Sequence, residues 1–159
     1  LCRWGYMLMI DPAGALAETR RVLRSGGRLA FSVWGAPERN PWASLVGRVL
    51  VAQGYVPPPD PEAPGIFAMA NPERIRKLVM GAGFAEPEIE EVSLRWPFTD
   101  QDDYWQFLIE VAGAISSVLQ TLPPEAQATV REQVYEAAGP FRSGEGYDFP
   151  AVCLNAVSH

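Results

Sequence analysis

The fold is decided by residues 11–34, which read DPAGALAETRRVLRSGGRLAFSVW. Asp11 followed by Pro12 is typical of a helix start, because aspartate can cap the first turn and proline fits the first helical position. Apolar residues then recur at helical spacing until a Gly-Gly pair ends the helix. Residues 28–34 alternate like a strand and carry apolar side chains on both faces. The stretch therefore predicts a helix and a strand covered on both sides, as in a βαβ unit.

The segments that follow extend this α/β prediction. Asn-Pro pairs at 40–41 and 71–72 predict two more helices, and apolar alternation predicts later strands. A long helix should begin near Asp100, with an apolar stripe that includes Leu108 and Ala112. We expect 1–99 and 140–159 to form a sheet with flanking helices, and 100–139 to form a helical insertion. The expected elements are helices 41–53, 72–80 and 123–138 and strands 88–98 and 151–157.

Composition excludes several classes of function. The chain has 159 residues and a formal net charge of -6, which argues against a nucleic-acid-binding surface. Its two cysteines, Cys2 and Cys153, form no metal-binding or disulfide pattern, so we expect a reducing compartment, the cytoplasm. No apolar run approaches the roughly 20 residues that a membrane span needs. The single histidine, His159, excludes a Ser-His-Asp triad and a histidine metal site, and we expect no metal.

One block of sequence carries a family resemblance. Asp11, Ala15-Leu16, Glu18 and residues 21–29 (RVLRSGGRL) match the pattern D-x-x-x-A-L-x-E-x-x-R-V-L-x-x-G-G-x-L. This pattern resembles the class I S-adenosylmethionine-dependent methyltransferases, in particular the ubiquinone/menaquinone-biosynthesis-like, methyltransferase type 11 group. Residues 78–84 (LVMGAGF), which precede a predicted strand, look like the L-x-x-A-G-F segment of the same family.

The resemblance implies the C-terminal portion of a Rossmann-like, seven-stranded methyltransferase sheet with a helical, lid-type insertion. Residues 1–2 would end the fourth strand, and residues 28–34, 88–96 and 151–157 would form the fifth, sixth and seventh. The glycine-rich segment that contacts S-adenosylmethionine in the family is not found. Gly144-Glu145-Gly146 lacks the strand–loop–helix context that such a loop needs. We therefore expect a fragment that is inactive alone.

The resemblance also suggests a site. It assigns Cys2, Arg3, Trp4 and Gly5 to the cofactor, since they match the segment near its methionine end. Aromatic side chains are the candidates for substrate contact, although core packing is the favoured explanation for most of those from Trp34 onward. Trp34 is the preferred candidate because it ends a strand. A core role for Trp4 and the neighbouring tyrosine is equally open, and a plain surface charge is favoured for Arg3. No catalytic side chain is expected, because the sulfonium is already reactive. The expected substrate-binding residues are Tyr6, Trp34, Trp42 and Phe67.

The function that these residues favour is S-adenosylmethionine-dependent methyl transfer to a small apolar or aromatic acceptor. The alternative is a non-catalytic small-molecule-binding or protein-interaction module derived from a methyltransferase. The expected partner is the small-molecule acceptor, with neither nucleic acid nor a membrane span. A sheet that ends in an open edge strand also predicts a homodimer, because such an edge can pair with another chain.

Overall fold

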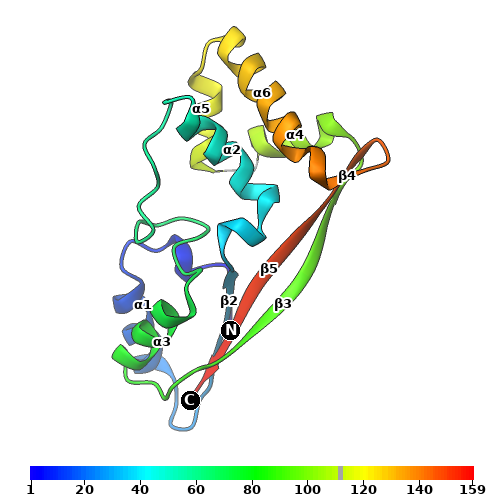
Figure 1. Cartoon of the computed structure of the whole chain (residues 1–159). Coiled ribbons are helices and arrows are strands. Elements are labelled where there is room, and N and C mark those ends of the chain that lie inside the picture. The colour runs from blue at the N-terminus through cyan, green and yellow to red at the C-terminus, as the bar shows by residue number, and fades with distance from the viewer. Residues whose placement is uncertain (111–112) are drawn as a thin grey trace. The chain divides into compact units, whose positions relative to one another are not determined.

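The computed structural model describes residues 1–110 and 113–159 (Figure 1). The chain divides into two compact units. The first unit comprises Leu1–Arg39, Pro59–Leu94 and Val152–His159. The second comprises Asn40–Pro58 and Arg95–Ala151.

The strands form a mixed sheet in the order β1-β2-β5-β3, and β4 pairs with β5. The parallel pair is β1–β2, in which Arg3 is in register with Ser32. Strand β5 runs antiparallel to β2 and places Asn155 opposite Ser32. This arrangement confirms the α/β prediction. The strands are β1 (Cys2–Arg3), β2 (Leu29–Trp34), β3 (Glu88–Phe98), β4 (Arg142–Ser143) and β5 (Gly146–Ser158).

Two helices of the first unit, α1 (Pro12–Val22) and α3 (Pro72–Gly81), lie beside each other near β2 (Figure 1). The predicted cap of α1 is present, because the Asp11 carboxylate accepts a hydrogen bond from Gly14 N at 2.8 Å. Leu16 on α1 and Val33 on β2 are fully buried, and Phe31 on β2 is 2% exposed. Burial of this apolar stripe and strand face holds the unit together, since each buried CH₂ contributes about 0.8 kcal/mol.

The second unit contains four helices among the residues that the structure describes. Helix α2 begins after Asn40, as predicted, but the Asn40 side chain does not cap it. Its Oδ1 instead accepts a 3.2 Å hydrogen bond from the indole Nε1 of Trp42. Buried Tyr104, Tyr147 and Phe149 form the aromatic core of this unit. The helices are α2 (Pro41–Ala52), α4 (Gln101–Glu110), α5 (Ala114–Thr121) and α6 (Pro124–Ala138).

The prediction of one long helix from Asp100 is wrong. Helix α4 ends at Glu110, and α5 begins at Ala114 after Gly113, which has a φ of +56°. A positive φ is incompatible with continuous helix, and glycine tolerates it best. Ala112, expected in the apolar stripe, lies outside the described residues. The boundaries of the helical insertion stay a prediction.

The last strand is longer than expected. It begins at Gly146, five positions before the predicted start, because β4 and β5 form a hairpin. Its two-residue loop is Gly144-Glu145, and Gly144 takes a φ of +62°. Glycine at the first position of such a loop is the usual solution, since the turn needs a positive φ there. Alternation alone does not reveal this extension, because prolines and aromatics interrupt the pattern.

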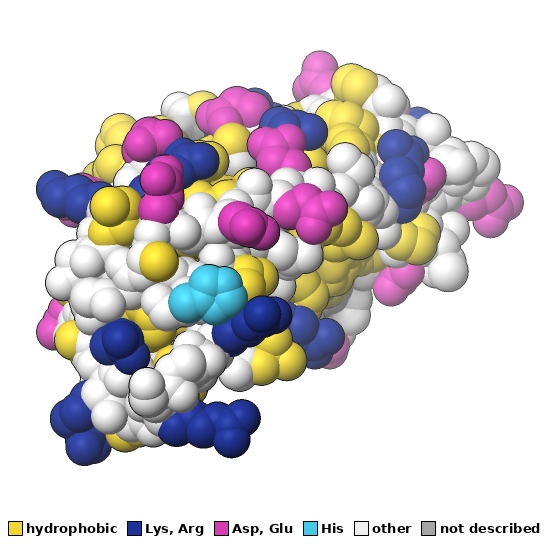
Figure 2. Space-filling model, turned by 90° about the horizontal axis from the view of Figure 1, so that it is seen from below, with side chains coloured by type: hydrophobic (Ala, Val, Ile, Leu, Met, Phe, Trp, Pro, Cys, Tyr) yellow, Lys and Arg dark blue, Asp and Glu magenta, His cyan; other side chains and the backbone are white. Residues whose placement is uncertain are grey.

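The surface carries both signs of charge. On the face in Figure 2, most Asp and Glu side chains lie in the upper part and several Lys and Arg side chains gather in the lower part, with hydrophobic side chains between them.

Within residues 1–110 and 113–159, no helix combines the length and the apolar character that crossing a membrane requires.

Candidate functional site

The ends of β1 and β2 bring the first predicted site residues together. Because the two strands are parallel, their carboxyl ends meet at one edge of the sheet, the edge at which open α/β sheets bind ligands. Trp4 follows directly after β1, and Trp34 is the last residue of β2. Their rings stack at a centroid distance of 4.8 Å and an interplanar angle of 10°. We call these two residues the tryptophan pair.

Trp4 has an unusual backbone. Its φ is +55°, and it is the one non-glycine residue with a positive φ among those that the structure describes. Its N–H donates a 2.8 Å hydrogen bond to Ser32 O, which continues the β1–β2 ladder by one residue. A bulky side chain in this region costs of order 1–3 kcal/mol and persists only where its surroundings fix it. Such strain is concentrated at functional sites, so Trp4 is the strongest candidate on the chain.

The Trp4 side chain is also incompletely satisfied. Its indole Nε1 is buried and has no hydrogen-bond partner. A buried donor without an acceptor costs about 1–3 kcal/mol. The strained backbone and the unpaired donor therefore occur in the same residue, at the edge where a ligand is expected.

Arg3 and Gly5 flank Trp4 on the chain. The Arg3 guanidinium carbon lies 4.8 Å from the centroid of the Trp4 ring, so the ring already holds a cation. In the part of the chain that the structure describes, no carboxylate pairs with Arg3. A Cβ at position 5 would lie only 2.6 Å from Cys2 Sγ, so a larger residue there would require the Cys2 side chain to move. Cys2 is half-buried at the start of the segment.

Tyr6 is part of the core of the first unit. It is 4% exposed, and its hydroxyl lies 2.7 Å from Thr19 Oγ1 on α1. Its ring meets Phe31 edge to face at 5.2 Å. Phe67 is half-buried in the same unit, and the nearby Gly65 N–H donates to the Met7 carbonyl at 2.9 Å. The proposed substrate role of both residues stays a prediction, although the Tyr6 hydroxyl is already occupied.

Trp42 belongs to the second unit, where it forms part of an aromatic cluster. Its ring stacks on Trp96 at 4.4 Å and 5°, and Phe107 lies 5.9 Å away. Its carbonyl accepts a 3.0 Å hydrogen bond from the Tyr104 hydroxyl. Burial raises the pKa of Tyr104, and the neighbouring Tyr147 adds to the effect. These contacts give Trp42 a packing role, and its assignment to substrate stays a prediction.

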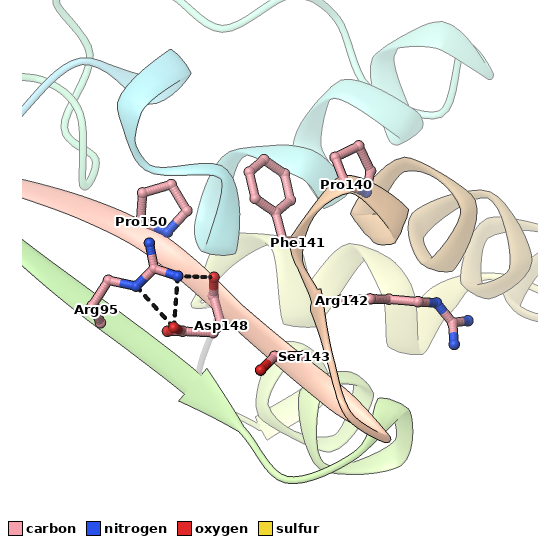
Figure 3. Close-up of a pocket in the computed structure, with 7 residues that line it drawn as sticks. All are labelled: Arg95, Pro140, Phe141, Arg142, Ser143, Asp148 and Pro150. Atoms are coloured by element: carbon pink, nitrogen blue, oxygen red, sulfur yellow. Dashed lines mark hydrogen bonds and ion pairs between the residues drawn. The ribbon is translucent and has the colours of Figure 1, made fainter.

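A recess of about 330 Å³ is present in the second unit (Figure 3). At its base, the Arg95 Nε and Nη2 atoms donate to Asp148 Oδ2 at 2.9 and 2.6 Å. This hydrogen-bonded carboxylate raises the pKa of Arg95. Asp148 Oδ1 is buried without a partner. The recess is lined by Arg95, Pro140, Phe141, Arg142, Ser143, Asp148 and Pro150.

Sequence reasoning does not find this recess. Arg95 and Asp148 are 53 positions apart, so no local spacing relates them. The pair connects β3 to β5, and most of the recess wall comes from the β4–β5 hairpin, which the sequence also leaves undetected. Burial of Asp148 Oδ1 does not distinguish the recess, because Trp4 Nε1 is buried in the same way, but the Arg95 guanidinium at the recess is already satisfied by the other Asp148 oxygen. The recess therefore ranks below the tryptophan pair as a site.

Neither Gly-x-Gly sequence has the geometry of a cofactor loop. Gly83, with a φ of +86°, follows the end of α3, and Gly144 turns the β4–β5 hairpin. A dinucleotide-type loop would join a strand to the start of a helix. Within the described residues, no group of three or more His, Cys, Asp or Glu side chains is arranged to hold a metal ion.

Comparison with known proteins finds relatives that are named as methyltransferases. The chain is 26% identical over 126 residues to methyltransferase ucsB of an Acremonium species, which is 79% of this chain and 41% of that protein. It is 30% identical over 103 residues to methyltransferase ktnA of Aspergillus niger, which is 61% of this chain and 32% of that protein. The matched segments thus span less than half the length of either relative.

Comparison with a solved structure and with family models gives no further evidence of function. A candidate methyltransferase from Bacillus halodurans C-125 aligns with 99% of this chain and 66% of its own, at 21% identity and a TM-score of 0.49. At that likeness the match is no evidence of activity. No family model matches the chain.

Proposed function

We propose a function from two observations. The chain has the class I S-adenosylmethionine-dependent methyltransferase fold, as its resemblance predicts. Its relatives are named methyltransferases. The proposed function is part of a methyl transfer from S-adenosylmethionine to a small apolar or aromatic acceptor. The observation that supports it is the tryptophan pair at the carboxyl ends of two parallel strands.

The residues around Trp4 fit one end of the cofactor. Its indole N–H, buried and unpaired, is a donor for a ligand acceptor, and Arg3 is a cation without a carboxylate partner, suited to a carboxylate by its forked donors. When bound, S-adenosylmethionine supplies an activated methyl group on a sulfonium. The contribution of this chain is to bind and orient, and no proton transfer is assigned to it.

Arg3 and the sulfonium of the cofactor would compete for the face of the Trp4 ring. Cation–π attraction is worth roughly 0.5–2 kcal/mol, and Arg3 now occupies the Trp4 ring. We therefore propose that Arg3 turns away from the ring when the cofactor binds and contacts its carboxylate. Trp34, the last residue of β2, would then flank the acceptor.

We also propose that the chain on its own transfers no methyl group. Both of its Gly-x-Gly sequences serve as turns elsewhere in the fold, so residues 1–110 and 113–159 offer no glycine-rich backbone cradle for the rest of the cofactor. Calorimetric titration of the chain with S-adenosylhomocysteine should accordingly show no tight, stoichiometric binding. Binding at micromolar affinity or better would contradict this part of the proposal.

A chimera tests the methyl-transfer function directly. The chain would be joined to the part of the Acremonium relative that the match leaves uncovered, and methylated products would be measured by mass spectrometry with small phenols and S-adenosylmethionine. We expect product formation that falls at least tenfold in Trp4→Ala. Tyr55→Ala, which removes an aromatic side chain that is 40% exposed in the second unit, is the matched control and should keep its activity.

The alternative, a non-catalytic binding or interaction module, predicts a different result. The chimera would then fold and yet give no product. Product formation that is unchanged in Trp4→Ala would instead contradict the role proposed for the tryptophan pair. Circular dichroism of each variant distinguishes loss of function from loss of fold.

A further inference from the structure

A row of polar residues crosses the sheet beside the tryptophan pair. Arg3 on β1 is in register with Ser32 on β2, and Ser32 is in register with Asn155 on β5. The Ser32 hydroxyl donates a 2.6 Å hydrogen bond to Asn155 Oδ1. Both side chains are half-buried. Ser32 is therefore held from one side by Asn155.

Ser32 in turn holds Trp4. Its carbonyl accepts the 2.8 Å hydrogen bond from Trp4 N, which extends the β1–β2 ladder beyond Arg3. Beyond it, Trp4 has a positive φ and an indole N–H without a partner, and both disfavour the observed conformation. Two contacts of the ring compensate for this: stacking on Trp34, where aromatic pairs contribute about 0.5–1.5 kcal/mol beyond burial, and the Arg3 guanidinium over the ring. Because these ring contacts contribute little free energy, the positive-φ conformation of Trp4 depends on the position of Ser32.

The alternation of side chains along β2 relates the Ser32–Asn155 hydrogen bond to the stacking of Trp34 on Trp4. Ser32 and Trp34 are two positions apart, so their side chains point to the same face of the sheet. Asn155 and Cys153 on β5 are in register with Ser32 and Trp34, respectively. A hydrogen bond between Ser32 and Asn155 thus fixes β2 on the face from which Trp34 meets Trp4.

We propose that Asn155, acting through Ser32, is a positioning residue that holds Trp4 in its left-handed conformation against Trp34. This inference rests on the proposed function only for its consequence, which is that the ligand-binding edge is preformed. Neither residue touches the proposed ligand, and their effect is on the orientation of the tryptophan pair.

The test uses the full chain and a spectroscopic signal of the pair. Two stacked indoles give an exciton couplet in the far-ultraviolet circular dichroism spectrum, and the component that disappears in Trp4→Phe belongs to the Trp4–Trp34 pair. Asn155→Ala and Ser32→Ala should each reduce this component by at least half. The double variant should lose no more than either single variant, because both remove one hydrogen bond.

Conservative variants separate positioning from folding. Asn155→Asp keeps an acceptor and Ser32→Thr keeps a donor, so both should retain the couplet. Gln53→Ala is the matched control, because it breaks another amide hydrogen bond, the 2.9 Å contact of Gln53 with Gln133 in the second unit. It should leave the Trp4 component unchanged.

Three outcomes decide the inference, and the first and third do not depend on methyl transfer. An unchanged couplet in folded Asn155→Ala overturns it. A reduced couplet without any effect of Trp4→Ala on the chimera would support the positioning role and refute the proposed function. Loss of the couplet in Gln53→Ala as well would show a general loosening of the fold and would also overturn the inference.

Discussion

At the scale of single residues, Trp4 carries most of the functional argument. Its strained φ, its unpaired indole N–H and its stacking on Trp34 coincide at the end of β1. The glycine that follows it is close to Cys2, because a Cβ at position 5 would lie 2.6 Å from Cys2 Sγ and displace that side chain. A tight, strained segment of this kind is expected to be retained for function rather than for stability.

The strain at Trp4 predicts that glycine at position 4 gives a more stable protein than alanine, the reverse of the usual order. Trp4→Gly should be more stable than Trp4→Ala by about 1 kcal/mol, because glycine adopts a positive φ without steric cost and both variants lose the same ring contacts. Urea denaturation followed by circular dichroism measures the difference. Equal stability, or a more stable alanine variant, would show that position 4 is not strained.

Tyr104 predicts a pH dependence of stability. Its pKa is raised chiefly by burial, so the folded chain keeps the phenol protonated where the unfolded chain ionises, near pH 10. The folded state then binds more protons, and the contribution is fully present below about pH 10 and lost as pH rises further. Tyr104→Phe should cost about 1 kcal/mol at neutral pH, since it removes the hydrogen bond to the Trp42 carbonyl.

Tyr104→Phe should also make the decrease of stability at alkaline pH less steep. Denaturation midpoints measured from roughly pH 8 to roughly pH 11 would fall less steeply in Tyr104→Phe than in the parent chain. Tyr135→Phe is the comparison variant, because the pKa of Tyr135 is also raised by burial but is partly lowered again by its hydrogen bond from Arg131. An identical pH profile in the parent and Tyr104→Phe would contradict the assignment.

At the scale of elements, glycines and prolines set most boundaries. Asp11 and Asn71 cap their helices through the side chain, whereas Asn40 contacts the Trp42 indole instead. The break between α4 and α5 depends on Gly113, which combines a φ of +56° with a ψ of -120°. Hydrophobic periodicity continues across this break, so it gives no sign of it.

Gly113→Ala tests the cause of that break. A Cβ would meet no atom within 4 Å, so the cost is conformational and not steric crowding by neighbours. We expect a loss of about 1–3 kcal/mol in the free energy of unfolding. Gly139→Ala is the control, since Gly139 has a helical φ of -47° and equal space, and should change stability by less than about 1 kcal/mol. Similar losses in both variants would refute the explanation.

At the scale of the whole molecule, the sheet ends in a two-residue edge strand. Strand β1 is paired only with β2 among the described residues, and Leu1 beside it is fully exposed. Exposed edges pair with other chains unless charge or proline prevents it. A homodimer through β1 therefore remains our prediction for the isolated chain.

Small-angle scattering over a concentration series tests this association. The apparent mass should rise with concentration, and Leu1→Lys should reduce the rise, because a charged side chain at the edge disfavours pairing. Val22→Lys, which places the same charge at an exposed apolar position on α1, is the control and should associate like the parent chain. A monomeric profile of the parent chain at every concentration would count against the prediction.

The amino-acid sequence by itself determined the local elements and the α/β class. Capping residues, the Gly-Gly stop and apolar alternation act over a few positions, and most helices and strands they predicted lie within a few residues of the observed ones. The exceptions are the helix expected from Asp100, which is two helices, and the start of the last strand. Only the tertiary structure decided the antiparallel place of β5 between β2 and β3, the stacking of Trp4 on Trp34 and the partners of Asn155. These features join residues 30 to more than 120 positions apart, and such contacts depend on strand register and packing, which local patterns do not encode.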